Sequence, residues 1–121
     1  MKKVLIVDDA AFMRISLRTL LEGHGFEVVG EADNGRSALR KYKECKPDIV
    51  TMDITMPECD GIEGLKEIMA IDPNATVVMI SATGQERLIK EAILNGAKSF
   101  IVKPFSPDRV LSTLMELAHA G

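Results

Sequence analysis

Four residues that could do chemistry together each follow a short apolar segment. The run VLIV is followed by Asp8 and Asp9, the run DIVTM by Asp53, and the run SFIV by Lys103. If these runs are strands of one parallel sheet, their carboxyl ends share an edge and the four side chains converge there. Three carboxylates and one ammonium group suit a hard, oxygen-preferring cation and a phosphoryl group.

The acidic pair has a simpler explanation, in which Asp8 or Asp9 caps the helix that follows. Asp53 is harder to explain in that way, because it ends an apolar segment and precedes the proline-bearing loop ITMPECDG. A carboxylate at a buried edge needs a partner. Three carboxylates a few ångströms apart would repel one another unless a cation lay among them, so the pattern predicts bound Mg²⁺.

Lys103 and Ser81 are the other candidates at this edge. Lys103 could pair with the acids and do nothing more, but it is also the point charge that a phosphoryl oxygen needs. Pro104 follows it, and a cis bond there could fix the direction of the lysine. Ser81 ends the segment VVMIS and supplies a hydroxyl, for which a strand-end hydrogen bond is the plain alternative.

Short apolar segments, mostly rich in β-branched residues, alternate with stretches whose apolar residues recur at helical spacing. The predicted strands cover residues 4–7, 26–32, 48–53, 76–81 and 99–103. The helices between and after them are marked by apolar positions that include Leu17, Tyr42, Leu65, Ala92 and Leu114. This alternation predicts one doubly wound α/β domain over residues 1–121, with a five-stranded parallel sheet covered by helices on both faces.

Turn-forming residues agree with these helices. Glycines follow the first and fourth helices, at Gly23, Gly25 and Gly96. Ser106 and Pro107 fit the N-cap and first turn of the last helix. Gly64 does not fit, because a glycine early in the third helix costs about 1 kcal/mol relative to alanine. We therefore expect a packing reason for Gly64.

The composition excludes several classes of protein. The chain has 121 residues, 15 Lys and Arg, 18 Asp and Glu, and a net charge of −3, without a long basic run. Binding to nucleic acid or to an anionic membrane by charge alone is therefore not expected.

The start MKKVLIVDD fits neither a signal peptide nor a membrane span, which favours a cytoplasmic protein. Cys45 and Cys59 lack the spacing of a zinc site and are expected to be reduced thiols.

The chain resembles the response-regulator receiver domains of two-component signalling, and most closely their free-standing chemotaxis members. The resemblance rests on the acidic pair in VLIVDD, the aspartate in DIVTMDITMPECDG, the hydroxyl-small pair in ISA and the lysine-proline in FIVKPF, in this order and with suitable gaps. It spans essentially the whole chain. It implies a flavodoxin-like sheet of strand order 2-1-3-4-5 and a monomeric protein.

The resemblance also implies roles for the site residues. Asp53 would accept a phosphoryl group from a phosphohistidine on a sensor histidine kinase. Asp9 and Asp53 would bind Mg²⁺ directly, with the backbone carbonyl of Thr55, and Asp8 would contribute through water. Lys103 would hold a phosphoryl oxygen.

A switch is implied as well. Ser81 would move toward the phosphoryl group and Phe100 would turn inward, changing the surface formed by the fourth helix, fifth strand and fifth helix. Many family members have threonine and tyrosine at these two positions, and Phe100 could equally be an ordinary strand residue. Thr55 and Thr83 resemble positions that control the access of water to the acyl phosphate. Their short uncharged side chains predict a phosphoryl lifetime of intermediate length.

The sequence alone leaves the downstream target of the protein open. The resemblance implies a chemotaxis kinase as donor, the flagellar motor switch as target and a separate phosphatase. A phosphorelay intermediate and a receiver cut from a longer DNA-binding regulator are the alternatives. His24 and His119 are not expected to donate the phosphoryl group. His24 lies between the first helix and the second strand, at the opposite edge of the sheet from Asp53, and His119 is near the chain end. We expect no enzymatic activity beyond self-phosphorylation and self-dephosphorylation. Haloacid-dehalogenase-like phosphatases also use a nucleophilic aspartate and Mg²⁺, but their two aspartates are two residues apart at the end of the first strand. Here Asp8 and Asp9 are adjacent, and the candidate nucleophile Asp53 follows the third strand.

Overall fold

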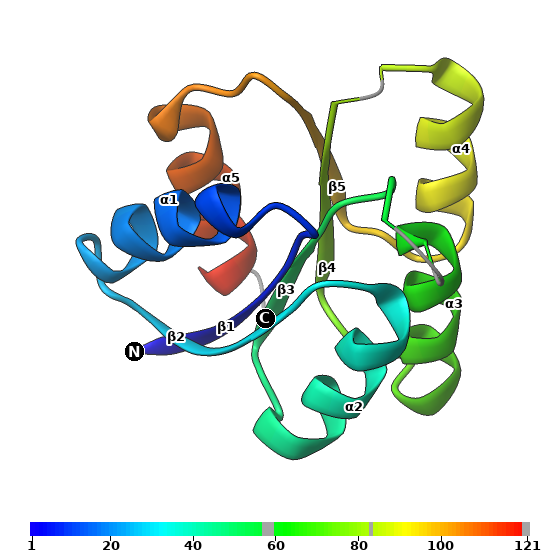
Figure 1. The fold of residues 1–121 in the computed structure, drawn as a ribbon, viewed down its shortest axis with the longest axis horizontal. Coiled ribbons are helices and arrows are strands. Elements are labelled where there is room, and N and C mark those ends of the chain that lie inside the picture. Colours follow the sequence, from blue (N-terminus) through cyan, green and yellow to red (C-terminus); the bar gives the residue numbers. More distant parts are fainter. Residues whose placement is uncertain (57–59, 83, 120–121) are drawn as a thin grey trace.

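The computed structural model of the chain describes residues 1–56, 60–82 and 84–119. Strands and helices alternate throughout this part of the chain (Figure 1). The strands are β1 (Lys2–Val7), β2 (Phe26–Ala32), β3 (Ile49–Met52), β4 (Val77–Ser81) and β5 (Ser99–Val102). The helices are α1 (Ala11–Glu22), α2 (Gly35–Cys45), α3 (Gly61–Ile71), α4 (Glu86–Leu94) and α5 (Pro107–His119). The predicted alternation is therefore confirmed.

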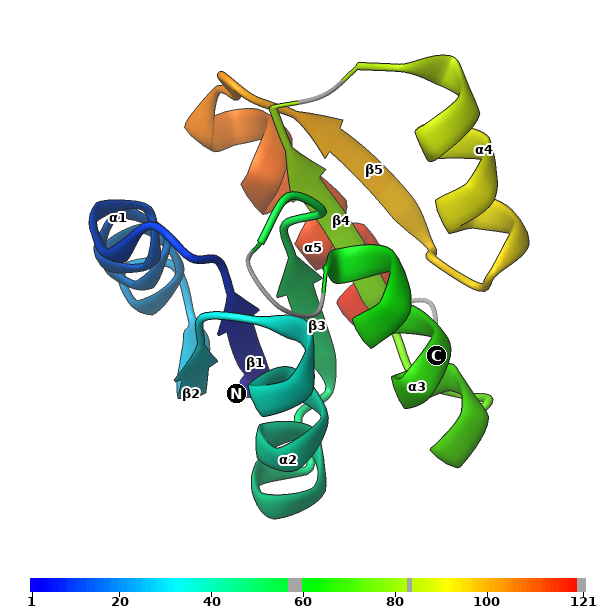
Figure 2. The ribbon, with the colours of Figure 1, turned by 45° about the vertical axis from the view of Figure 1, so that its right-hand side comes forward.

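The strands form one parallel sheet of order β2-β1-β3-β4-β5, which Figure 2 shows from β2 at one side to β5 at the other. The predicted flavodoxin-like order is confirmed. The chain moves outward from β1 to β2, then returns past β1 to β3, so the direction of winding reverses between β1 and β3. Val7 is paired with Met52, and Met52 with Met79. The carboxyl ends of β1 and β3 are thus level with one another, and β4 continues past them to Ser81.

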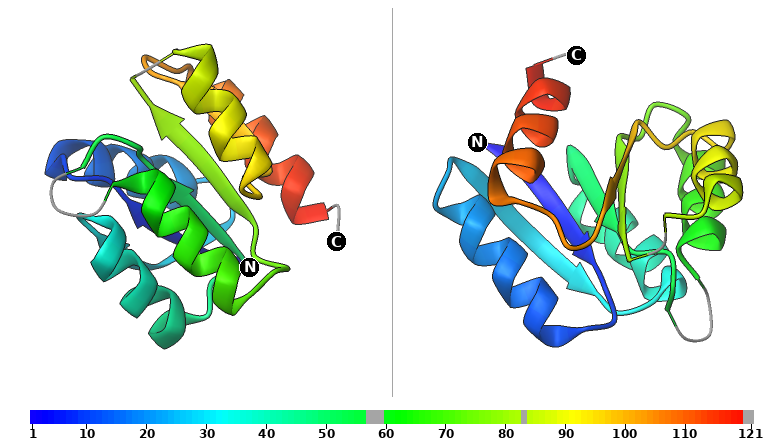
Figure 3. Two further views of the ribbon diagram at one scale, coloured as in Figure 1. Left: turned by 90° about the vertical axis from the view of Figure 1, so that its right-hand side faces the viewer. Right: turned by 90° about the horizontal axis from the view of Figure 1, so that it is seen from above.

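Helices cover both faces of the sheet. Helices α1 and α5 lie on one face, and α2, α3 and α4 lie on the other (Figure 3). Each face has its own apolar layer, because alternate residues of a strand point to opposite sides. On the α1 and α5 face, Ile6 and Ile80 pack with Leu17 and Leu111. On the other face the layer is larger and includes residues of three helices.

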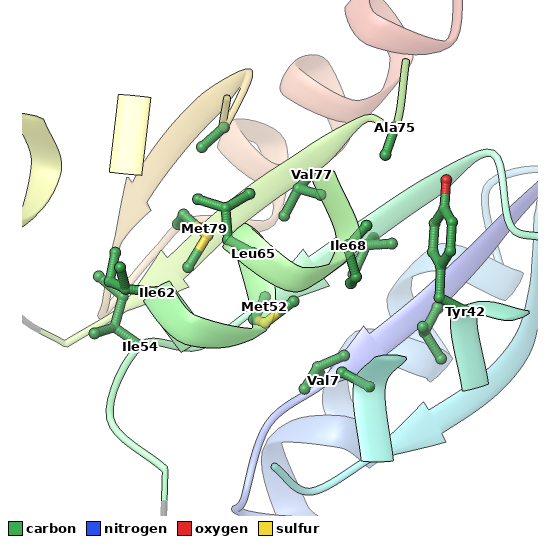
Figure 4. Close-up of a cluster of buried hydrophobic side chains, with 14 of the residues drawn as sticks. Val7, Tyr42, Met52, Ile54, Ile62, Leu65, Ile68, Ala75, Val77 and Met79 are labelled. Carbon is green, nitrogen blue, oxygen red and sulfur yellow. The ribbon is translucent and has the colours of Figure 1, made fainter. Parts of the chain in front are cut away.

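The larger layer explains the glycine inside α3. Met52 and Met79 of the central strands lie among Leu65 and Ile68 of α3 in this layer (Figure 4). A Cβ atom at Gly64 would lie 3.0 Å from the sulfur of Met52 and 3.1 Å from the Cα atom of the first residue of α2. The expected packing reason is therefore the close approach of α3 to α2 and to the centre of the sheet.

Five strand boundaries differ from the prediction by one or two residues. β1 begins earlier, at Lys2, and β3 and β4 begin one residue late, at Ile49 and Val77. β3 and β5 end one residue early, at Met52 and Val102. Backbone pairing nevertheless continues past both ends. The N–H of Asp53 donates to the carbonyl of Val7 at 3.0 Å, and the N–H of Lys103 donates to that of Ser81 at 2.8 Å. The functional residues therefore lie directly past the regular strands, held by their backbones.

The helix ends mostly follow the turn-forming residues. The N–H of Arg109 donates to the Ser106 hydroxyl at 3.2 Å, which confirms the predicted N-cap of α5. Gly25 and Gly96 have positive φ angles of 88° and 107°, a region that glycine enters without a Cβ clash. Lys46 ends α2 with φ 48°, and the sequence contains no signal that predicts a left-handed lysine there.

No helix within the described ranges is both long and apolar enough to span a membrane.

Candidate functional site

Three carboxylates meet at the carboxyl edge of the sheet, as predicted. Asp8 follows β1 and Asp53 follows β3, and these residues are only 2% and 7% exposed. Asp9 is exposed. Each of the three offers an oxygen, and these oxygens all lie within 4.8 Å of one another. Residues 45 positions apart are thereby combined into one cluster of hard oxygen donors.

The carboxylate of Asp8 is held on both sides. Its Oδ1 accepts a hydrogen bond from the N–H of Ala10 at 2.9 Å, and its Oδ2 accepts one from Lys103 Nζ at 2.7 Å. Ala10 is the N-cap of α1, and no side chain caps this helix. The simpler explanation of the acidic pair as a helix cap is therefore wrong. Asp8 instead joins the turn after β1 to the lysine after β5.

Asp53 is buried beside the same lysine. Its Oδ1 accepts a hydrogen bond from the N–H of Ile54 at 2.8 Å, and its Oδ2 lies 3.7 Å from Lys103 Nζ. Burial raises the pKa of the Asp53 carboxyl above its ordinary value; Lys103 opposes this rise and the charge of Asp8 adds to it. A further cation at the cluster would favour the ionised form of Asp53.

Gly61 is a functional residue that our sequence reasoning missed. A Cβ atom at this position would overlap the carbonyl oxygen of Asp53 and lie 2.8 Å from its carbonyl carbon. The N–H of Gly61 donates to the carbonyl of Ile54 at 2.8 Å. The start of α3 therefore folds directly against the backbone of Asp53. The pair Asp60-Gly61 is the signal that was available, since Asp60 is the N-cap and accepts from the N–H of Glu63.

Lys103 reaches into the cluster from the edge of the sheet. Its side chain is 15% exposed, and its ammonium group lies near both Asp8 and Asp53. The peptide bond between Lys103 and Pro104 is cis, as the sequence allowed. Lys103 thus brings a positive charge to the acidic cluster, although it lies 95 residues from Asp8 in the chain.

The hydroxyl of Ser81 is buried and unpaired. Ser81 is 1% exposed, and its Oγ has no hydrogen-bond partner among the described residues. The hydroxyl is close enough to the Asp53 carboxylate to lower its pKa, but the contact lacks hydrogen-bond geometry. Burying a hydroxyl without a hydrogen-bond partner costs folding free energy. The Ser81 hydroxyl would recover this cost by donating to a new oxygen at the site.

Phe100 lies on the same side of the sheet as Ser81. Phe100 belongs to β5 and is paired with Met79 of β4. Its half-buried ring packs against the layer that contains Ala92 of α4 and Ala97. Val102 is paired with Ser81. Ser81 and Phe100, to which the resemblance gives switch roles, are therefore near neighbours on adjacent strands.

The acidic cluster could hold Mg²⁺ on the chemistry of its donors. Asp9 has an exposed carboxylate, Asp8 and Asp53 are acceptors, and all three present oxygen, which is the ligand that Mg²⁺ prefers. Thr55 follows Asp53 by two residues and is exposed. Thr83 and Cys59 lie outside the described residues.

The remaining candidates lie away from this cluster. Both histidines line a cavity beside the starts of β1, β2 and β3, at the opposite edge of the sheet from Asp53. The ring Nδ1 of His24 lies 2.8 Å from the carbonyl of Leu20. Cys45 is a free thiol whose Sγ lies 3.4 Å from the carbonyl of Val29.

Comparisons with known proteins give the family. Residues 4–115 match the response regulator receiver domain. Chemotaxis protein CheY of Thermotoga maritima is 61% identical over 117 residues, which covers 97% of this chain and 98% of that protein. CheY of Listeria monocytogenes is 58% identical over 118 residues, covering 98% of this chain and 99% of that protein.

Solved structures agree. The crystal structure of the CheX-CheY-BeF3-Mg²⁺ complex from Borrelia burgdorferi matches with a TM-score of 0.93 and 45% identity, covering 97% of this chain and 89% of that chain. The response regulator domain of Thermotoga maritima CheB matches with a TM-score of 0.87 and 40% identity, covering 99% of this chain and 96% of that chain. This protein therefore belongs to the response regulator receiver domain family.

Proposed function

We propose that this chain is a chemotaxis regulator of the CheY type, a single receiver domain over residues 1–121 that is phosphorylated on Asp53. The observation that carries the proposal is the position of Lys103 Nζ, 2.7 Å from Asp8 and 3.7 Å from Asp53. One positive group thus lies beside the buried acceptor and beside a second acid. The similarity to CheY of Thermotoga maritima supports the chemotaxis role.

The reaction is transfer of a phosphoryl group from a phosphohistidine of a histidine kinase. An oxygen of the Asp53 carboxylate attacks phosphorus, the N–P bond to the imidazole breaks, and its electron pair stays on the imidazole nitrogen. The products are an acyl phosphate on Asp53 and a histidine that takes up a proton. Little covalent work is left for the protein, so positioning and charge stabilisation account for the catalysis.

Asp9, Asp53 and the backbone carbonyl of Thr55 are the residues that would hold Mg²⁺, with Asp8 contributing through water. The bound ion supplies positive charge against the phosphoryl oxygens. Lys103 supplies a second positive charge from the side of β5. Asp8 keeps the lysine directed toward the site through the 2.7 Å contact with Nζ. Water then hydrolyses the acyl phosphate, at a rate tuned by Thr55 and Thr83.

The output is docking of the phosphorylated form on another protein. The surface of α4, β5 and α5 carries large exposed apolar side chains, namely Ile93, Leu94 and Val102, at 47%, 84% and 42% exposure. This surface begins beside Ser81, because Val102 is paired with it. We propose that it docks on the flagellar motor switch protein, and that a phosphatase ends the signal.

The donor step is tested with a chemotaxis kinase whose histidine carries radioactive phosphate. The wild type is expected to take the label within the mixing time in the presence of Mg²⁺, and Asp53→Asn is expected to take none. Transfer to Asp53→Asn at the wild-type rate would place the acceptor elsewhere. Return of the label from Asp53 to a histidine phosphotransfer domain, without binding to the motor switch, would favour a phosphorelay.

The output step is tested by titrating a motor-switch peptide into the phosphorylated protein. Leu94→Ser is expected to weaken peptide binding while phosphorylation is unchanged. Ile71→Ser is the matched control, since Ile71 is also exposed, at 48%, but belongs to α3. Equal peptide affinity in Leu94→Ser and the wild type would reject this docking surface.

A further inference from the structure

The backbone of Asp8 is held from two directions by groups outside the acidic cluster. Its N–H donates to the carbonyl of Ala32 at 3.0 Å. Its carbonyl accepts a hydrogen bond from Nη1 of Arg14, one turn into α1, at 2.6 Å. Arg14 in turn donates from Nε to Glu31 Oε1 at 3.0 Å. Glu31 and Ala32 are neighbours at the end of β2, so one end of this strand fixes both sides of the Asp8 backbone.

The carbonyl that Arg14 binds belongs to the peptide unit joining Asp8 to Asp9. Because a peptide unit is planar, fixing the direction of this C=O also fixes the N–H of Asp9 and the path of the chain into its Cα atom. Within the described part of the chain, the Asp9 carboxylate is exposed and has no hydrogen bond of its own. The backbone is therefore what places the Asp9 carboxylate in the cluster.

Glu31 holds Arg14 in the required orientation. Its second oxygen, Oε2, accepts a hydrogen bond from Nε of Arg18 at 2.8 Å, so the carboxylate bridges two guanidinium groups. The side chains of Arg14 and Glu31 are 20% and 29% exposed. Burial alone would raise the pKa of Glu31, but the hydrogen bonds from Arg18 and Arg14 hold it below its ordinary value of 4.5. Glu31 is thus charged at neutral pH and pairs with both guanidinium groups.

We propose that Arg14 is a positioning residue for the cation site, which acts by holding the Asp8–Asp9 peptide and not by touching the ion. The proposal rests on the proposed function, in which Asp9 binds Mg²⁺. Arg14 would then keep the two adjacent acids in the arrangement that brings their oxygens and that of Asp53 within 4.8 Å.

The direction in which Mg²⁺ affinity changes when Arg14 is replaced distinguishes a positioning role from a purely electrostatic one. A guanidinium near three acids repels a cation, so removal of its charge should strengthen Mg²⁺ binding if charge were all that mattered. Loss of a positioning contact has the opposite effect. Removal of groups that orient metal ligands typically lowers metal affinity by about tenfold to a hundredfold.

The experiment is calorimetric titration of Mg²⁺ into the wild type and into Arg14→Met and Arg18→Met. Arg14→Met keeps the apolar stem and loses the contact to the Asp8 carbonyl, and is expected to weaken Mg²⁺ binding by about tenfold. Arg18→Met removes a guanidinium from the same Glu31 without touching Asp8, and is expected to bind Mg²⁺ like the wild type. Equal or tighter binding by Arg14→Met overturns the proposal.

A second variant covers the case in which Arg14→Met does not fold. The amide nitrogen of Arg14→Gln lies about where Nε of arginine lies, so it can replace the bond to Glu31 but is too short to reach the Asp8 carbonyl. It is expected to weaken Mg²⁺ binding as Arg14→Met does, at an unfolding temperature close to that of the wild type. Wild-type Mg²⁺ affinity in Arg14→Gln overturns the proposal.

Two readouts separate this proposal from the function on which it rests. In the metal-free protein, the amide resonance of Asp9 is expected to shift in Arg14→Gln and to stay in place in Arg18→Met; an unshifted Asp9 resonance in Arg14→Gln counts against positioning. If the wild type itself binds no Mg²⁺, the proposed function fails and takes this inference with it. If the wild type binds Mg²⁺ and Arg14→Gln binds it equally, the inference alone fails.

Discussion

The backbone N–H of Lys103 donates a hydrogen bond to the carbonyl oxygen of Ser81 across 2.8 Å. This bond joins the ends of β4 and β5, so the lysine and the buried hydroxyl enter the site from one rigid backbone pair. The Lys103 side chain is already engaged with Asp8, whereas the Ser81 hydroxyl has no partner in the described part of the chain. Phosphorylation can therefore give the Ser81 hydroxyl a hydrogen bond that it lacks, whereas Lys103 already has a partner.

Ser81→Ala is therefore predicted to separate stability from switching. The unphosphorylated variant should be no less stable than the wild type, because it loses a hydroxyl that is buried without a hydrogen bond. Urea unfolding measures this. After phosphorylation, the change in amide hydrogen exchange around Phe100 should be smaller than in the wild type. An unaltered exchange response in Ser81→Ala would show that the hydroxyl does not transmit the signal.

Lys103→Met is predicted to retain Mg²⁺ and to lose response. The ammonium group contacts Asp8 and Asp53, so its removal leaves the acids without their resident positive charge. Mg²⁺ should therefore bind at least as tightly as in the wild type, as calorimetric titration can measure. Phosphorylation should no longer strengthen binding of the motor-switch peptide. Weaker Mg²⁺ binding in this variant would mean that Lys103 orients the acids and does not compete with the cation.

Gly61→Ala is predicted to damage both the fold and the acceptor. The added Cβ would overlap the Asp53 carbonyl oxygen, which is backbone and cannot rotate away. We expect a loss of about 1–3 kcal/mol in unfolding free energy, together with slower phosphorylation. At Gly84 the nearest atom to an added Cβ is 4.0 Å away, so Gly84→Ala is the control for stability and should change it by less than about 0.5 kcal/mol. Equal effects at the two positions would contradict the close approach at Gly61.

Two buried threonines make a matched pair for the cost of an unpaired hydroxyl. Thr51 is 1% exposed and its Oγ1 has no partner among the described residues, whereas Thr113 Oγ1 donates to the carbonyl of Arg109 at 2.7 Å. Thr51→Val keeps the shape and should raise the free energy of unfolding by about 1 kcal/mol, while Thr113→Val should lower it by about 1 kcal/mol. Thermal or urea unfolding checks both. A destabilised Thr51→Val would mean that water satisfies this hydroxyl.

Much of the fold could be predicted, because its signals are local. Buried strands of a parallel sheet are short apolar runs, and Ser106 and Gly96 mark helix ends through their own hydrogen bonding and φ angle. The convergence of Asp8 and Asp53 follows a general rule, by which sites in open parallel sheets lie at the carboxyl ends of the strands. Flavodoxin and CheY are standard examples of that rule.

The remaining features of the fold and the site depend on contacts between elements that are distant in the sequence. The close contact of Gly61 with Asp53 and of Gly64 with α2 arises only when the elements pack together. Arg14 reaches the Asp8 carbonyl because Glu31, on another strand, fixes its guanidinium. The helix-cap explanation of the acidic pair was wrong for the same reason: the Asp8 carboxylate turns toward Lys103, 95 residues away.

The central claim is that Asp53 is an Mg²⁺-dependent phosphoryl acceptor. The most direct test is the intact mass of the protein after incubation with a small acyl-phosphate donor, with and without Mg²⁺, for the wild type and Asp53→Asn. The account predicts a gain of one phosphoryl group that requires Mg²⁺ and is absent from the variant. No gain under any condition, or an equal gain in Asp53→Asn, would contradict it and leave a docking module that works without phosphorylation of Asp53.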